Sequence, residues 1–321
     1  MNRLASGRAV VVYIVLAYAS AWLVCLPLWL GGGLASPLFL PCTVTMMFTP
    51  LASAVVATRF VERTPLRTLG LGAPKPVGRF VGFLAIALVG VLALVLAAQA
   101  TSALLGQYRF DLVGLSGLRE LVTRQLSAVG RTVDSIGMPM QVLAGVALVQ
   151  VVVGSLINTV PAFGEEVGWR GFLFPRLQEL FGPVAAVVGT GVTWGLWHAP
   201  VILLGYNYPG NPVLGLGAMC VMTTLFGAFL GWLRQRSGSV WPAALGHGTL
   251  NAAVTTFAVV LGAAGQHLDT LAATIMGWSG WPIPLVVAAV LLWRGAFRPY
   301  AAPDAPVSTG PITSPEPRSS Q

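Results

Sequence analysis

Charged residues are scarce in this sequence, at 9% of 321 residues, against roughly 25% in soluble domains. A soluble domain of this length could not cover its surface with so few charges. Hydrophobic residues make up 55% of the chain, which excludes a mainly disordered protein because low hydrophobicity is the mark of disorder. The three cysteines, Cys25, Cys42 and Cys220, lie in different apolar segments and form no CxxC pair. Neither a disulfide framework nor a cysteine metal site is therefore expected, and the class that remains is a polytopic membrane protein.

Long apolar runs predict how this chain crosses the bilayer. Most reach the ~20 residues that a helix needs to span the hydrocarbon core, and the last is shorter. Apolar–polar alternation over ~10-residue segments, the mark of a transmembrane barrel, is missing. The sequence predicts an all-α, polytopic bundle of about eight transmembrane helices over residues 1–298, followed by a disordered cytoplasmic tail at 299–321, which is rich in Pro, Ser and Ala. The runs cover residues 9–30, 38–58, 80–105, 138–162, 183–206, 213–233, 240–263 and 281–293.

Two segments allow alternative interpretations. The first run follows Arg3 and Arg8 as a signal peptide would, but it is longer than the 7–15 apolar residues of a usual signal sequence, so we interpret it as a retained helix. Residues 106–137 are either an amphipathic segment lying on the outer membrane interface or a plain solvated loop.

The distribution of basic residues predicts how the protein is oriented in the membrane. If eight helices alternate, fourteen of the eighteen Lys and Arg residues fall on one side. The other four, Arg109, Arg119, Arg124 and Arg131, share the 106–137 segment. The positive-inside rule then places both termini in the cytoplasm of a multi-pass protein of the cell membrane. The lipid bilayer is the expected partner, and no motif supports binding to nucleic acid, despite the net charge of +8.

Ionisable residues within apolar segments are costly and are therefore candidates for function. Glu165, Glu166 and Arg170 occur together, with Glu166 and Arg170 spaced i, i+4 for an ion pair on a helix. Arg170 would then neutralise one carboxylate and leave Glu165 free to act as a general base. The alternative is a solvated helix start, where acidic residues are favoured by the helix dipole.

Two histidines lie in later apolar segments. His198 follows Trp194 by four residues, and His247 precedes Asn251 by four, so each pair shares a helix face. A carboxylate with a histidine can activate water, and a histidine with an asparagine can donate hydrogen bonds to an oxyanion. The third histidine, His267, is expected to be an ordinary surface residue. Neither Gly-x-Ser-x-Gly nor His-Glu-x-x-His occurs, which argues against a serine nucleophile of that type and against a zincin.

In combination, the Glu165-Glu166-x-x-x-Arg170, Trp194-x-x-x-His198 and His247-x-x-x-Asn251 motifs resemble the CAAX-protease and bacteriocin-processing (CPBP, or Abi) family of intramembrane endopeptidases. The match runs from residue 161 to about 255, inside a family-like core at about 138–263. One departure is Trp194, where the family usually has Phe.

The resemblance implies a bundle of about eight helices with an intramembrane, water-accessible cavity, and hydrolysis of a peptide bond. By similarity, Glu165 and His198 would activate water, Glu166 and Arg170 would organise the site, and His247 and Asn251 would stabilise the oxyanion. The expected substrate is a membrane-associated peptide or protein, and nothing in the sequence indicates a prenyl pocket. We expect no cofactor. The alternative is zinc, since Glu165, Glu166, His198 and His247 are possible ligands. The rival function is a non-enzymatic immunity or binding protein of the same fold.

Overall fold

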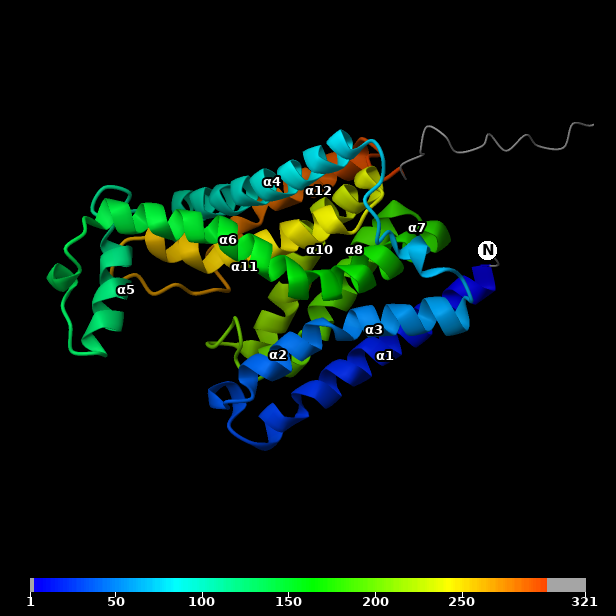
Figure 1. The fold of residues 1–321 in the computed structure, drawn as a ribbon, viewed down its shortest axis with the longest axis horizontal. Coiled ribbons are helices and arrows are strands. Elements are labelled where there is room, and N and C mark those ends of the chain that lie inside the picture. Colours follow the sequence, from blue (N-terminus) through cyan, green and yellow to red (C-terminus); the bar gives the residue numbers. More distant parts are fainter. Residues whose placement is uncertain (1–2, 299–321) are drawn as a thin grey trace, which may run out of the picture.

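The computed structural model describes residues 3–298, so the predicted tail at 299–321 lies outside the described residues. Within this range no β-strand forms, and an isolated bridge joins Phe110 to Gly262. The predicted all-α membrane bundle is confirmed (Figure 1). Its α-helices are α1 (Arg3–Leu30), α2 (Phe39–Met47), α3 (Thr49–Val56), α4 (Val77–Leu104), α5 (Ser116–Ser127), α6 (Met140–Glu166), α7 (Phe174–Phe181), α8 (Pro183–Trp197), α9 (Ala199–Ile202), α10 (Pro212–Ser237), α11 (Trp241–Val260) and α12 (Pro282–Trp293).

Short helical turns connect or extend several of these helices. The 3-10 turns are η1 (Gly33–Ala35), η3 (Leu66–Leu69), η4 (Val133–Ile136) and η6 (Trp278–Gly280). Two segments are π-helical, η2 (Ala57–Val61) after α3 and η5 (Val167–Leu173) between α6 and α7. Because π-helical turns disrupt regular hydrogen bonding and often occur at functional sites, η5 indicates a candidate functional site at the end of α6.

Six helical segments within 3–298 are long and apolar enough to cross a membrane: Ser6–Leu30, Phe39–Val61, Val77–Leu104, Met140–Phe181, Pro212–Ser237 and Trp241–Val260. Two shorter apolar helices, Pro183–Trp197 and Pro282–Trp293, account for the remaining two predicted runs. The predicted run 183–206 does not form one helix. Its first half is α8, whose 15 residues rise about 22 Å, and the chain then leaves the helix at His198. Irregular backbone at membrane depth is tolerated where it lines a cavity, and His198 lines one.

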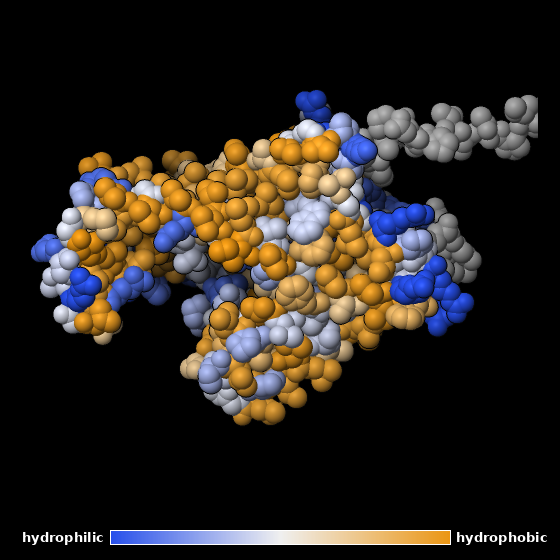
Figure 2. Space-filling view, viewed as in Figure 1, coloured by the Kyte–Doolittle hydropathy of each residue, from blue (hydrophilic) through white to orange (hydrophobic). Residues whose placement is uncertain are grey.

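Apolar side chains cover the outside of the bundle, as lipid contact requires. On α6, Val149, Leu156 and Ile157 are each at least 60% exposed. In Figure 2 the hydrophobic colour extends over the middle of the molecule, while hydrophilic patches gather at its two ends, the one that carries α7 and the start of α1 and the one that carries α5. A bilayer would solvate this apolar surface, whereas water would not.

Helix α5 forms an arm at the opposite end of the bundle (Figure 1). Leu118 on α5 is buried in a small cluster with Val260 at the end of α11. The backbone N–H of Gly265 donates to Glu120 at 2.9 Å, and this bond holds the pKa of Glu120 below its usual value. The plain-loop alternative for this segment is therefore wrong over α5, because an amphipathic helix packs against the bundle there.

The backbones of α6 and α11 approach each other closely near the middle of the bundle. A Cβ atom on Gly248 would lie 2.7 Å from the carbonyl oxygen of Ser155 and 2.7 Å from the amide nitrogen of Thr159. Real Cβ atoms do not approach so closely, so only glycine allows the two backbones this separation. The contact occurs one residue after His247, and it therefore fixes that imidazole relative to α6.

Candidate active site

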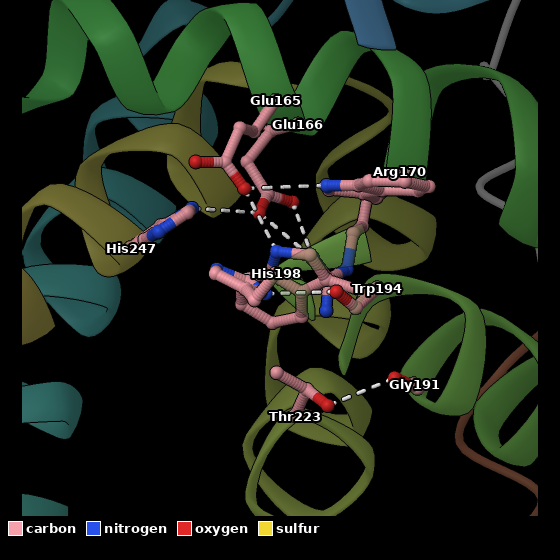
Figure 3. A network of polar contacts seen from close by, with 9 residues as sticks. Glu165, Glu166, Arg170, Gly191, Trp194, His198, Thr223 and His247 are labelled. Carbon is pink, nitrogen blue, oxygen red and sulfur yellow. Dashed lines mark hydrogen bonds and ion pairs between the residues drawn. The ribbon is translucent and has the colours of Figure 1, made fainter. Parts of the chain in front are cut away.

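Three segments that are distant in sequence bring the predicted site residues together (Figure 3). The junction of α6 and η5 supplies Glu165, Glu166 and Arg170. The end of α8 supplies His198, and α11 supplies His247 with Asn251 one turn later. Of the six predicted residues, Glu165, His198, His247 and Asn251 line one cavity, and Glu166 and Arg170 lie behind it.

Glu166 and Arg170 form a buried ion pair. Arg170 Nη1 donates to Glu166 Oε1 at 2.7 Å and to Oε2 at 3.0 Å, and neither side chain is exposed. The guanidinium carbon also lies 4.3 Å from the ring centre of Trp194. His247 Nδ1 is 3.0 Å from the same Glu166 Oε1. Glu166 therefore connects the arginine to one imidazole, and both of its oxygens are occupied.

One oxygen of the Glu165 carboxylate accepts hydrogen bonds and the other is free. Its Oε2 accepts a hydrogen bond from Trp194 Nε1 at 2.7 Å and one from Trp169 Nε1 at 3.3 Å. Its Oε1 accepts no hydrogen bond from the described residues, and Figure 3 shows it pointing away from the Glu166–Arg170 pair. Two fixed indole donors orient the carboxylate and leave one oxygen available for a ligand or a water molecule.

Hydrogen bonds assign the proton positions on His198. Its Nδ1 is 2.8 Å from the carbonyl oxygen of Trp194. Because a carbonyl oxygen only accepts, Nδ1 carries the proton, and Nε2 of the neutral ring is an acceptor. The rings of Trp194 and Trp197 pack against this imidazole and hold its orientation. His198 can thus accept a hydrogen bond through Nε2.

The cavity in front of these groups has a volume of about 520 Å³. Methionine side chains of α2 and α10 contribute much of its apolar wall, and residues of the 206–207 and 268–276 segments line its outer part. Figure 2 shows the surface hollowed between the α5 arm and the part of the molecule that contains α2. Access is therefore from the end of the bundle that carries α5.

The donor geometry does not fit a metal ion. Within residues 3–298, no three His, Cys, Asp or Glu side chains are grouped so that they could hold one. Arg170 Nη1 bonds to both oxygens of Glu166, so this carboxylate is not available as a ligand. A zinc site needs at least three protein donors around one point, and this arrangement does not provide them.

Comparison with known proteins finds a similarity to one family. Residues 145–253 match the family model described as type II CAAX prenyl endopeptidase, Rce1-like. The predicted resemblance is confirmed. A CAAX prenyl protease 2 from Methanococcus maripaludis is 41% identical over 44 residues, a stretch that covers 14% of this chain and 16% of that protein. The Rce1-like match extends from α6 into α11 and includes all six predicted site residues.

Sequence reasoning missed the two indole donors. Trp194 lies four residues before His198, where the family usually has Phe, and neither feature predicts a bond to Glu165; Trp169 is not among the predicted site residues. The structure shows that both Nε1–H groups bond to Glu165. The signal was present, because a tryptophan that replaces phenylalanine beside a buried carboxylate adds a hydrogen-bond donor that phenylalanine lacks. His267 is exposed, as predicted for a surface residue.

Proposed function

We propose that this protein is an intramembrane endopeptidase that hydrolyses a peptide bond of a membrane-associated substrate, with water activated by Glu165 and His198. The observation that carries the proposal is the free Oε1 of Glu165, which faces a cavity that His198 and His247 also line. A carboxylate oriented by two donors and supplied with an open oxygen is suited to general-base catalysis. The Rce1-like family match supports the same class of reaction.

In the first step, a water molecule between Glu165 Oε1 and His198 Nε2 loses a proton to the carboxylate. Its oxygen attacks the carbonyl carbon of the scissile bond and forms a tetrahedral intermediate with a negatively charged oxygen. The Nδ1–H group of His198 donates to the carbonyl oxygen of Trp194, so Nε2 accepts a hydrogen bond from the water and fixes its position.

In the second step, His247 and Asn251 stabilise the oxyanion. Glu166 accepts from His247 Nδ1 and so fixes the orientation of the ring, and Nε2, when it carries a proton, donates to the oxyanion. The amide nitrogen of Asn251 supplies a second donor. Glu165 then returns its proton to the leaving nitrogen, the carbon–nitrogen bond breaks, and both fragments are released.

We further propose that the protein lies in the cell membrane with both termini in the cytoplasm. The concentration of basic residues at the end of the bundle that carries η3 and the end of α10 supports this orientation. The cavity would then open on the face opposite the cytoplasm, since its lining comes from the 206–207 and 268–276 segments.

The proposal is tested by incubating the purified protein in detergent with a panel of membrane-anchored peptides and identifying the products by mass. We expect cleavage at a single internal bond, at a rate that EDTA leaves unchanged, because the donor set does not fit zinc. A loss of cleavage in EDTA that stoichiometric zinc restores would overturn the metal-free mechanism and leave the hydrolase assignment intact. Absence of cleavage in the whole panel would favour the binding or immunity function.

A further inference from the structure

Arg234, in the last turn of α10, has no counter-ion among residues 3–298. Its Nε is buried and has no hydrogen-bond partner in this part of the chain. The charged group that acts on its guanidinium is a second cation, Arg176, which repels it. Burying an unpaired charge is costly, and an orphaned buried donor requires an explanation. A cation in this state indicates a ligand of negative charge.

The carboxylate of Glu62, in the residue after η2, is already paired with Arg176. Arg176 Nε donates to Glu62 Oε1 at 3.1 Å, and Nη2 donates to Oε2 at 2.7 Å. The two side chains are almost fully buried. Two parallel N–H···O bonds are the strong form of this ion pair, so Glu62 neutralises Arg176 and not Arg234. The surroundings of Arg234 therefore keep a net positive charge.

The η3 turn supports the Arg234 guanidinium from one side. A Cβ atom on Gly70 would lie 2.5 Å from Nη2 and 2.6 Å from Cζ, so the guanidinium lies directly against the Gly70 backbone. Gly70 has a φ of +75° and its carbonyl oxygen accepts from the N–H of Val240 at 3.0 Å, which fixes the turn to the start of α11. Arg234 as a whole is only partly buried, and its two Nη atoms remain accessible.

The guanidinium lies at the depth of the lipid headgroups. The apolar spans Phe39–Val61 and Val77–Leu104 flank the η3 turn, and α10 ends three residues after Arg234. The connection between α3 and α4 lies at the end of the bundle that carries α7 (Figure 1), and it also contains the exposed residues Arg63 and Arg67. Basic clusters immediately outside a membrane span attract anionic lipids.

We propose that Arg234 and the η3 turn form a binding site for a phosphate group, supplied by the headgroup of an anionic phospholipid. The accessible Nη atoms would donate to phosphate oxygens, which arginine recognises through paired hydrogen bonds. Inorganic phosphate offers the same oxygens, and the test below separates the two sources. Neither Arg234 nor the η3 turn lines the cavity, so the inference does not depend on the proposed endopeptidase function.

The test measures the unfolding temperature of the delipidated full-length protein in a neutral detergent, with phosphatidylglycerol, phosphatidylcholine or inorganic phosphate added. We expect saturating phosphatidylglycerol to raise this temperature by about 4 °C or more, because a ligand that binds the folded state stabilises it. Phosphatidylcholine, which has no net charge, should raise it much less. A shift with inorganic phosphate and not with the lipid would support the phosphate site and assign it a soluble ligand. No shift with either anion would overturn the inference.

Arg234→Gln tests which residue binds the anion. This variant should lose most of the shift, and without additive it should unfold at or above the wild-type temperature, because it removes an unpaired charge. Arg236→Gln is the matched control. Arg236 is exposed two residues later on α10, where it does not face the same side of the helix, and its loss should leave the shift intact.

Three outcomes with these variants would overturn the site. A shift that Arg234→Gln retains would show that the anion binds elsewhere. An equal loss in both variants would indicate a non-specific attraction of anions to a basic surface. An Arg234→Gln protein that unfolds below the wild-type temperature without additive would show that Arg234 already has a stabilising partner within the chain.

Discussion

Replacing Glu165 by glutamine is expected to lower kcat/KM for peptide cleavage by about 10²–10⁴-fold, the usual contribution of a general base. The glutamine amide oxygen can still accept the bonds from Trp169 and Trp194, so the local structure is retained. It cannot take a proton from water. The measurement is the initial rate of product formation, followed by mass spectrometry, with thermal unfolding in the same detergent as a check on folding.

Glu179→Gln is the matched control for this variant, because Glu179 is an exposed acid on α7 that does not line the cavity. It should cleave at the wild-type rate. A Glu165→Gln protein that retains most of its activity and its wild-type unfolding temperature would show that this carboxylate is not the base.

The second large effect concerns stability. Replacing Arg170 by methionine is expected to lower the free energy of unfolding by about 3–5 kcal/mol, the cost of leaving a buried charge without its partner. Neither Glu166 nor Arg170 is exposed to solvent, so water cannot compensate the carboxylate that remains, and His247 bonds to only one of its two oxygens. Denaturant unfolding of the purified protein in detergent, compared with wild type, measures the difference.

The double variant Glu166→Gln with Arg170→Met separates this explanation from a simple packing defect. It removes both charges, and we expect it to recover a large part of the stability that the single variant loses. If the double variant is as unstable as the single variant, the loss arises from packing against Trp194 rather than from the uncompensated charge.

Apolar runs were sufficient to predict the membrane bundle, because helices are the structures that satisfy every backbone group across lipid within one segment. They could not predict that the run beginning at Pro183 leaves the helix at His198, since hydropathy does not distinguish a spanning helix from one that ends at a cavity. The sequence also left open whether the 106–137 segment forms a helix that packs on the bundle, because the burial of this helix depends on contacts with the distant end of α11.

The motif residues could be predicted as a set, and the connections between them could not. The i, i+4 spacing indicated the Glu166–Arg170 pair, and both residues lie in one continuous helical segment. By contrast, the bond between His247 and Glu166 joins residues 81 positions apart, and no local pattern encodes it. The π-helical turn of η5 likewise follows from the packing of several helices.

Delivery of water to the peptide bond by Glu165 can be followed in a single turnover in water labelled with heavy oxygen. With enzyme in excess over a cleavable peptide, we expect one heavy oxygen atom in the new carboxyl terminus of the product and none in the Glu165 side chain. An unlabelled product together with heavy oxygen in Glu165 would instead show direct attack by the carboxylate, and a complete absence of cleavage would show that the protein does not hydrolyse the peptide.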